Sequence, residues 1–223
     1  MSESIAVLGG TGALGFGIAL RLAAAGHAVV IGSRDAGRAE GAADRLRALL
    51  PEADVRGCAN GDAARAADRL VILSVPLTSQ VSTIKAVAED LEAGKILLDA
   101  TVPLAPAVGG RPTQLVGLWS GSAGEQAAAA VPPGVGVVSG LHTLSAASLE
   151  ALDQDLDQDT LICGDSKDDK QVVRVLIGSV TGLRVVDAGR LEMSRLVESL
   201  TPLLIGINIR NKTHAGIRIV GLP

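Results

Sequence analysis

The chain has 223 residues and a mass of 22.5 kDa, the size of one domain or of one domain with a small addition. Its net charge of −4 argues against a protein that binds nucleic acid or an anionic membrane, since both functions favour a basic surface. With one Trp, one Phe and no Tyr, the chain lacks base-stacking platforms and any tyrosine that could act as a catalytic acid.

The first half of the chain alternates short apolar segments with segments of helical spacing. Continuous apolar runs are typical of strands that are buried on both faces of a parallel sheet. Gly26 and Pro51 follow the first two predicted helices and are typical helix-ending residues. The order predicts an α/β protein with a Rossmann-type, doubly wound parallel sheet. Strands are predicted at 5–8, 29–31, 70–75 and 96–98, and helices at 14–25, 38–50 and 78–92.

The pattern loosens in a Pro- and Gly-rich loop at 102–121. A helix is predicted at 122–130, where Ser122 and Glu125 have the spacing of a capping box. We place a boundary near residue 143, which divides the chain into a Rossmann domain (1–143) and a small C-terminal α/β domain (144–223). The later predicted elements are strands at 137–138, 161–163 and 183–186, helices at 170–180 and 191–207, and a tail at 217–220.

A glycine-rich loop follows the first predicted strand and begins the first predicted helix. Gly10, Gly12 and Gly15 form a G-x-G-x-x-G motif, and this context is typical of dinucleotide binding. Gly10 permits a tight turn, Gly12 lets the backbone approach a pyrophosphate, and Gly15 lets helix and strand pack closely. We therefore expect a pyrophosphate at the helix N-terminus, where backbone N–H groups are free.

The end of the second predicted strand indicates which dinucleotide binds. Ser33 and Arg34 stand where an NAD site has an acidic residue, and Arg38 follows one helical turn later. Two guanidinium groups and a hydroxyl favour the 2′-phosphate of NADP, and Thr11 could add a second hydroxyl. Asp35 could instead bind the 2′-hydroxyl of NAD, and the arginines could be ordinary surface charges, so NAD stays an alternative.

Two further strand ends are expected beside the nicotinamide. One carries Ser74, Val75 and Pro76, and the other carries Val102. Ligands of open α/β sheets bind at the carboxyl ends of the strands, although a proline there is also common in ordinary turns. The short C-terminal region is too small to enclose a substrate. The substrate site should therefore be shallow or completed by a second subunit, which suits a planar substrate that accepts a hydride by stacking.

Cysteine, histidine and hydropathy patterns narrow the class further. Cys58 and Cys163 form no paired-thiol motif, and the three histidines show no metal-ligand spacing, so we expect no metal and no oxidising compartment. Mean hydropathy is +0.38, yet no uncharged run reaches the roughly 20 residues of a membrane span. The N-terminus lacks the basic region of a signal peptide. These features predict a cytoplasmic protein that binds no membrane.

Six segments in chain order make the sequence resemble one family of reductases. They are the loop at 9–15, Ile31-Gly-Ser-Arg34, Leu141-His-Thr-Leu144, Cys163-Gly-Asp165, Val186-Asp-Ala-Gly189 and Leu196-Val-Glu-Ser-Leu-Thr-Pro-Leu-Leu204. Together they resemble the NADPH-dependent reductases of coenzyme F-420 (F420), also called F420:NADP oxidoreductases. The resemblance implies hydride transfer between carbon 4 of the nicotinamide and carbon 5 of an 8-hydroxy-5-deazaflavin. It also implies a Rossmann domain with a small C-terminal domain, in a homodimer.

The resemblance also implies roles for individual residues. His142, Ser199 and Thr201 would hydrogen-bond the polar edge of the deazaflavin as catalytic residues, and His142 would help its proton uptake. Arg195 would bind a phosphate or carboxylate of F420 or stabilise its anionic ring, with Ala215 nearby. Without the resemblance, His142 could be a core histidine, and Arg195 could pair with Glu198; Ser199 and Thr201 could cap or bend a helix. The implied NADP contacts are Thr11, Gly12, Ala13, Leu14, Ser33, Arg34 and Arg38.

The expected chemistry suits the composition. Hydride transfer between stacked rings needs no metal, no Tyr acid and no Lys base, only two reactive carbons held roughly 3–3.5 Å apart. Two alternatives stay open because a fold does not fix a function. One is an NADP-dependent imine or ketone reductase that acts on a small substrate. The other is a non-catalytic NADPH-binding module that senses redox state.

Overall fold

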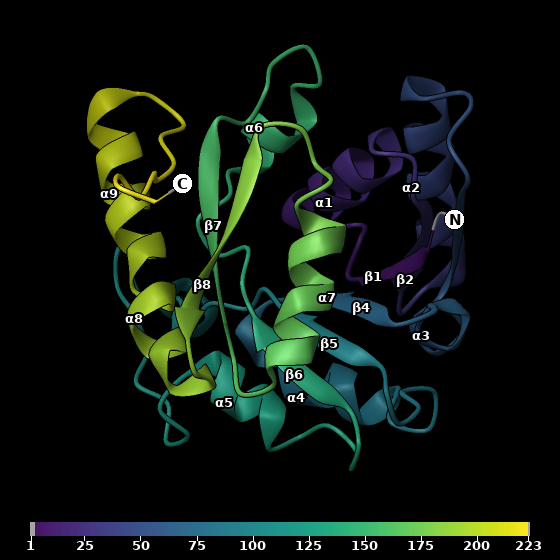
Figure 1. Ribbon diagram of the computed structural model, residues 1–223, viewed down its shortest axis with the longest axis horizontal. Coiled ribbons are helices and arrows are strands. Elements are labelled where there is room, and N and C mark those ends of the chain that lie inside the picture. The colour runs from purple at the N-terminus through teal and green to yellow at the C-terminus, as the bar shows by residue number, and fades with distance from the viewer. Residues whose placement is uncertain (1–2, 223) are drawn as a thin grey trace.

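The computed structural model describes residues 3–222, which form an eight-stranded sheet with helices on both faces (Figure 1). The strand order is β3-β2-β1-β4-β5-β6-β7-β8, and neighbouring strands are parallel except for the antiparallel pair β6 and β7. The strands are β1 (Ser4–Leu8), β2 (Ala28–Ser33), β3 (Val55–Ala59), β4 (Leu70–Leu73), β5 (Ile96–Asp99), β6 (Gly136–Ser139), β7 (Gln158–Gly164) and β8 (Leu183–Gly189).

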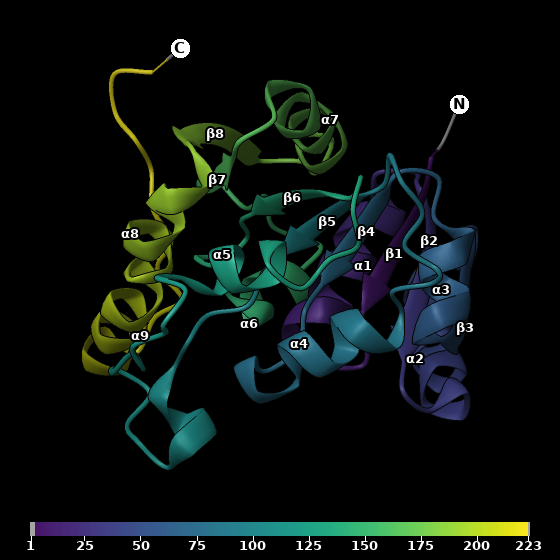
Figure 2. The ribbon, with the colours of Figure 1, turned by 90° about the horizontal axis from the view of Figure 1, so that it is seen from below.

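Helices cover the two faces of the sheet in two groups. Helices α1, α2, α6 and α7 pack on one face, and α3, α4 and α5 pack on the other. Helices α8 and α9 lie together at the β8 end of the molecule, far from β3 (Figure 2). The helices are α1 (Ala13–Ala24), α2 (Ala36–Leu49), α3 (Asn60–Ala66), α4 (Leu77–Ala86), α5 (Ala123–Ala128), α6 (Ala146–Glu150), α7 (Lys167–Ile177), α8 (Ser194–Glu198) and α9 (Leu200–Asn211); short 3-10 turns span Ala105–Val108 and Leu191–Met193.

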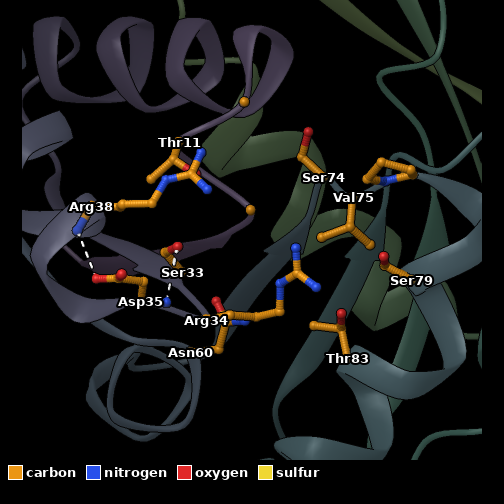
Figure 3. Close-up of a pocket in the computed structure, with 13 residues that line it drawn as sticks. Thr11, Ser33, Arg34, Asp35, Arg38, Asn60, Ser74, Val75, Ser79 and Thr83 are labelled. Atoms are coloured by element: carbon orange, nitrogen blue, oxygen red, sulfur yellow. Dashed lines mark hydrogen bonds between the residues drawn. The ribbon is translucent and has the colours of Figure 1, made fainter.

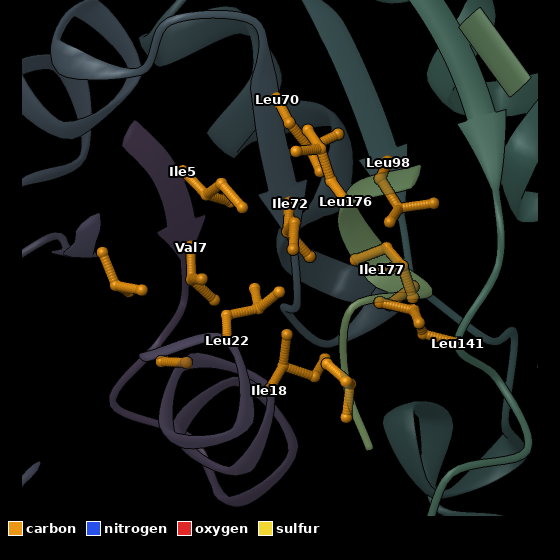
Figure 4. Packing of buried hydrophobic residues seen from close by; sticks show 14 of the residues in the cluster. Ile5, Val7, Ile18, Leu22, Leu70, Ile72, Leu98, Leu141, Leu176 and Ile177 are labelled. Carbon is orange, nitrogen blue, oxygen red and sulfur yellow. The ribbon is translucent and has the colours of Figure 1, made fainter. Parts of the chain in front are cut away.

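Strand β1 shows why the central strands are continuously apolar. Ile5 and Val7 point into the core layer beside α1, while Ala6 and Leu8 point into the layer beside α3 and α4. All four side chains are fully buried, because both faces of a doubly wound sheet are covered. Figure 4 shows Val7 beside Leu22 of α1 in this packing. The predicted fold class, an α/β protein with a Rossmann-type sheet, is confirmed.

The structure contains one strand, β3, and two helices, α3 and α6, that the sequence pattern did not predict. Strand β3 lies at the edge of the sheet and lacks an apolar run, since Arg56 is exposed and Gly57 follows it. Gly57 is required there because a Cβ atom would lie 2.3 Å from the carbonyl oxygen of Ala39 on α2. Helix α3 begins directly after β3 at Asn60. The missing strand therefore also concealed the start of this helix.

The prediction of one continuous helix at 191–207 is wrong. The structure has a 3-10 turn, then α8, then α9, which begins at Leu200. Pro202 explains the break, because it has no N–H group to donate to the carbonyl of Glu198 one turn earlier. The hydroxyl of Ser199 at the junction donates instead to the carbonyl of Arg195, at 2.7 Å.

Other expectations have mixed outcomes. Ser122 caps α5 by accepting a hydrogen bond from the N–H of Glu125, as predicted, and Gly26 has a positive φ of 89° after α1. Helix α4 ends at Ala86, earlier than predicted. Strands β7 and β8 continue the same sheet as β1–β6, while the division at residue 143 stays a prediction. Within residues 3–222, no helix combines the length and apolar character needed to cross a membrane.

Candidate active site

A cavity of about 360 Å³ opens where β1, β2 and β4 end (Figure 3). The strand order reverses here, since β2 lies on one side of β1 and β4 lies on the other. Such a reversal point is where open α/β sheets bind their ligands. The cavity is lined by Gly9, Thr11, Gly12, Ser33, Arg34, Asp35, Arg38, Asn60, Ser74, Val75, Pro76, Ser79 and Thr83.

The floor of the cavity is the glycine loop. Gly9 has a φ of 78°, and a Cβ atom there would lie 2.3 Å from the carbonyl oxygen of Ser74. Gly15 is equally confined, because its Cβ would lie 2.6 Å from the carbonyl oxygen of Gly9. Gly12 is the N-cap of α1 and offers no side chain to its N–H groups. The first turn of α1 therefore keeps the free N–H groups that a pyrophosphate needs.

Two arginines line the cavity just beyond the end of β2. Within residues 3–222, neither Arg34 nor Arg38 has an ion-pair partner, and both are exposed. Asp35, which could have bound the ribose of NAD, instead caps α2 by accepting a hydrogen bond from the N–H of Arg38 at 3.1 Å. Figure 3 shows the Arg38 side chain reaching toward Thr11. Unpaired guanidinium groups beside hydroxyls fit a phosphate.

Three residues of the cavity were not predicted. The carboxamide oxygen of Asn60 is buried and has no hydrogen-bond partner among the described residues. An orphaned acceptor of this kind fits a cavity that a polar ligand fills. Ser79 and Thr83 lie one turn apart on α4 and present their hydroxyls on the same side (Figure 3). The spacing of two hydroxyl residues by four positions after Pro76 could have identified Ser79 and Thr83 from the sequence. Asn60 could not be identified, because it follows β3, which the sequence pattern did not predict.

Several predicted cofactor residues lie outside the cavity lining. Gly10 and Gly15 support the loop from beneath, and Ala13 and Leu14 form the first turn of α1. Val102 does not line the cavity, although it follows Thr101, whose hydroxyl lies 3.5 Å from the carbonyl oxygen of Val75. The predicted contacts of these residues with NADP stay predictions.

A second group of predicted residues lies at the end of β6. Leu141 has a φ of 67°, in the left-handed region that a leucine rarely adopts, and its N–H donates to the hydroxyl of Thr160. The next residue is His142, whose carbonyl accepts a hydrogen bond of 2.8 Å from the Thr201 hydroxyl. The structure thus brings His142 and Thr201 together, while Ser199 lies at the junction two residues before Thr201.

The electrostatic state of His142 differs from the expectation. The side chain is 5% exposed, and burial lowers its pKa to about 4. Its Nε2 lies 3.4 Å from the hydroxyl of Ser139. The expectation that His142 titrates in a range suited to proton uptake is therefore wrong, because an apolar surrounding disfavours the charged imidazolium. At neutral pH this side chain is a neutral hydrogen-bonding group.

Arg195 and Ala215 also have partners that the sequence did not indicate. Arg195 forms an ion pair of 2.8 Å with Glu125 of α5, and not with Glu198 as the spacing allowed. Ala215 donates its N–H to the side-chain oxygen of Asn208 on α9, at 2.8 Å. Arg195 remains half exposed and is able to meet an anionic ligand.

Two buried carboxyl groups lie between these two groups of residues. Asp99, at the end of β5, accepts hydrogen bonds from Gln80 and from the hydroxyl of Thr101, both at 2.7 Å. Burial raises the pKa of Asp99 to about 7. Burial likewise raises the pKa of Glu198, which accepts two backbone N–H groups of α5, to about 7. The sequence placed Asp99 only in a strand end expected beside the nicotinamide, and it placed Glu198 only as a candidate surface partner of Arg195.

The remaining metal and thiol candidates are few. Among residues 3–222, no three His, Cys, Asp or Glu side chains gather as a metal site would require, and the expected absence of a metal stays a prediction. Cys58 and Cys163 are both free thiols. Burial raises the pKa of Cys163 to about 11, so this thiol stays protonated and unreactive.

Sequence comparisons give one consistent result. Residues 4–103 match the family described as NADP oxidoreductase coenzyme F420-dependent. The F420-dependent NADP reductase of Methanocaldococcus jannaschii is 44% identical to this chain, over 98% of the chain and 98% of the relative. The F420-dependent NADP reductase of Methanothermobacter marburgensis is 43% identical, over 98% of the chain and 99% of the relative.

Solved structures agree with the sequence relatives. A protein of Arthrobacter sp. FB24, described as a candidate F420-dependent NADP reductase, superposes with a TM-score of 0.82 at 31% identity, over 98% of this chain and all of that chain. An imine reductase of Bacillus cereus superposes with a TM-score of 0.63 at 16% identity, over 94% of this chain and 63% of its own. The second similarity shows a shared fold only.

The raised pKa of Asp99 predicts how stability depends on pH. The folded chain holds this proton up to about pH 7, whereas the ordinary pKa is 3.8, so the contribution of Asp99 to stability falls as pH rises between these values. Asp99→Asn removes that dependence. The wild type should therefore lose up to about 1.4 kcal/mol per pH unit relative to this variant.

Urea unfolding between pH 4 and pH 8 measures this difference. Asp54→Asn is the matched control, because Asp54 is exposed and should leave the curve parallel to that of the wild type. Parallel curves for Asp99→Asn and the wild type would show that Asp99 ionises normally.

Proposed function

The chain belongs to the family of F420-dependent NADP reductases, and from this premise we propose that it transfers a hydride between NADP(H) and F420 at the carboxyl edge of β1, β4, β5 and β6. The observation that carries the proposal is the cavity itself. It joins a glycine loop to Arg34 and Arg38, which have no ion-pair partner in the described chain. The reaction takes place between carbon 4 of the nicotinamide and carbon 5 of the deazaflavin, which supply the reactivity.

The protein binds and orients NADP(H) from one side. The free N–H groups of the first turn of α1, which begins at Ala13, hold the pyrophosphate, while the N–H of Gly12 donates to the carbonyl of Gly9 within the loop. Ser33, Arg34 and Arg38 hold the 2′-phosphate, the group that NADP has and NAD lacks. The nicotinamide end lies toward Ser74, Val75 and Pro76, where β4 ends. The same arrangement carries the hydride in either direction.

The F420 side is assigned to the residues around the end of β6. His142 acts there as a neutral hydrogen-bonding group, since its pKa of about 4 keeps the ring uncharged at neutral pH. Ser199 and Thr201 offer hydroxyl oxygens, and Arg195 offers a half-exposed guanidinium for an acidic part of F420. Ala215 lies beside α9 through its hydrogen bond to Asn208. Main-chain hydrogen bonds hold the ends of β4, β5 and β6 side by side, which supports a site where both substrates meet at one edge.

The two alternatives are not favoured. Imine reductases share the fold at 16% identity, which carries no argument about substrate. A redox sensor needs no second site, whereas the chain aligns with F420-dependent reductases over nearly its full length. Transfer between the two rings without a metal is part of the proposal. We also place the protein in the cytoplasm, with support from its two unpaired cysteines.

A homodimer is a further part of the proposal. Leu203 and Ile209 on α9 are 58% and 63% exposed, and Leu196 on α8 is 59% exposed. Trp119, in the loop before α5, is fully exposed. Figures 1 and 2 show α8 and α9 together at one side of the molecule with no helix outside them. Exposed apolar side chains on these two neighbouring helices favour burial against a second copy of the chain.

Leu203→Glu tests the dimer. The wild type should sediment at micromolar concentration with twice the 22.5 kDa mass of the chain, and the variant with the mass of one chain, because a buried charge opposes association. The emission of Trp119 should shift to longer wavelength in the variant as the side chain returns to water. Val175→Glu, on α7, is the control that should stay dimeric. A wild type with the mass of one chain would contradict the proposal.

Loss of absorbance of oxidised F420 tests the reaction and the coenzyme together. The wild type should reduce F420 rapidly with NADPH and slowly with NADH. Arg34→Ala and Arg38→Ala should each raise the KM for NADPH by roughly 10- to 100-fold, the value of one charge-assisted contact, and leave NADH almost unchanged. Arg69→Ala removes an exposed arginine at the opposite edge of the sheet and serves as the control.

The two parts of the proposal fail separately in this assay. Equal rates with NADPH and NADH would keep the reaction and reject the 2′-phosphate site. A wild type that binds NADPH and leaves F420 oxidised would reject the reaction.

A further inference from the structure

The carboxylate of Glu198 joins two helices that are far apart in the chain. Its two oxygens accept hydrogen bonds of 3.0 Å from the N–H groups of Ala123 and Gly124, at the start of α5. The side chain is 1% exposed. We call this pair of hydrogen bonds the Glu198 bridge. Two bonds to successive N–H groups fix both the distance and the angle between α8 and α5.

The other side of α5 is joined to α4 and β5. The carbonyl of Ala123 accepts a hydrogen bond of 2.9 Å from Nε2 of Gln80, and the same Nε2 donates to Asp99 at 2.7 Å. Gln126 of α5 donates to Oε1 of Gln80 at 2.7 Å. Gln80 is completely buried. A continuous chain of hydrogen bonds therefore runs from α8 through α5 to α4 and to the end of β5.

The contacts around α5 leave little room for movement. A Cβ atom on Gly124 would lie 2.8 Å from Cβ of Ser139 on β6 and 3.0 Å from Oγ of Ser194 on α8. At the surface, the ion pair between Arg195 and Glu125 joins the same two helices a second time. Helix α5 is thus held against α8 and β6 at the distance that only a glycine permits.

The two ends of this chain of hydrogen bonds lie at the two halves of the site. Helix α4 carries Ser79 and Thr83, which line the NADP cavity next to Gln80. On the other end, Glu198 is followed directly by Ser199 and then Thr201, which are assigned to F420. The distance between the two substrates therefore depends on the groups that join α4 to α8.

We propose that Glu198 and Gln80 are positioning residues for hydride transfer. Together they set the placement of α8 and α9, which carry the residues assigned to F420, relative to α4, which lines the NADP cavity. The proposal rests on the proposed function. A buried carboxylate contributes little net stability, because its desolvation offsets its hydrogen bonds. Its specific effect is geometric, and transfer between two rings is sensitive to displacements near 1 Å.

Glu198→Gln is the first test. The amide keeps the size of the side chain but turns one acceptor into a donor that faces a backbone N–H, so the bridge loses one bond. With NADPH and F420, we expect kcat to fall about tenfold or more and the KM for F420 to rise. The Kd of NADPH, measured by fluorescence, should stay within about twofold, since the NADP cavity lies beyond the bridge. A general loss of structure would weaken the binding of NADPH and of F420 alike.

Glu192→Gln is the matched control, because Glu192 lies on the same segment, is exposed, and its side chain makes no contact with α5 among the described hydrogen bonds. It should keep wild-type kinetics. A folded Glu198→Gln variant with the kinetics of Glu192→Gln would overturn the proposal. A loss of affinity for NADPH as large as the loss for F420 would also overturn it. An inactive wild type would instead overturn the proposed function.

Gln80→Met is the second test, and it keeps the proposal falsifiable if Glu198→Gln does not fold. Methionine matches the length of glutamine and removes its hydrogen bonds to Asp99 and Ala123. Although Gln80 lies on the NADP-binding helix, we expect the same fall in kcat and rise in the F420 KM. The double variant should lose little more than either single variant, because both break one connection. Fully additive effects, or a loss of NADPH binding alone, would overturn the proposal.

Discussion

The backbone contact between Gly9 and Ser74 is the constraint on which the site depends. With a Cβ atom 2.3 Å from the carbonyl oxygen of Ser74, any other residue at position 9 would separate β1 from the end of β4. Because the contact holds, the chain turns at once into α1, and the N–H groups of that helix face the cavity. In the proposed function, the place of the pyrophosphate and the direction of the nicotinamide depend on this close approach.

The pairing of the strands relates the cavity to the residues that we assign to F420. Strands β4, β5 and β6 are parallel neighbours and end at the same edge, so the cavity and the buried His142 lie at the same edge of the sheet. The path is polar where it is buried: Asp99, Gln80 and Glu198 are almost completely enclosed. Such groups are tolerated inside a protein when each finds hydrogen-bond partners, and here those partners belong to different helices. The same bonds that satisfy them also fix how the helices are arranged.

Prediction from sequence succeeded where one local pattern decided the outcome. The apolar runs of β1, β4 and β5 and the spacing of Gly10, Gly12 and Gly15 depend only on neighbouring residues, and the structure has these elements. It failed where distant residues decide. Strand β3 has no apolar run, because pairing with β2 and the contact of Gly57 with Ala39 define it. Because β3 was not predicted, Asn60, which follows it, was not predicted to line the site.

The same distinction explains the electrostatics. The identity of His142 suggests a group that titrates near neutral pH, but its burial, which the sequence does not show, lowers its pKa to about 4. Glu198 looked like a surface partner for Arg195, whereas the break before Pro202 and the packing of α5 enclose it. Charge pairs within a helix are visible in a sequence, while pairs between segments 70 or more residues apart are not.

The most direct test of the account is to follow the hydride itself. The protein would be given F420 and NADPH that carries two deuterium atoms at carbon 4 of the nicotinamide, in ordinary water, and the reduced F420 would be analysed by mass spectrometry and NMR. Direct transfer between the two rings predicts one deuterium at carbon 5 of the product. Reduced F420 without deuterium would contradict the account, because the hydrogen would then have passed through the solvent.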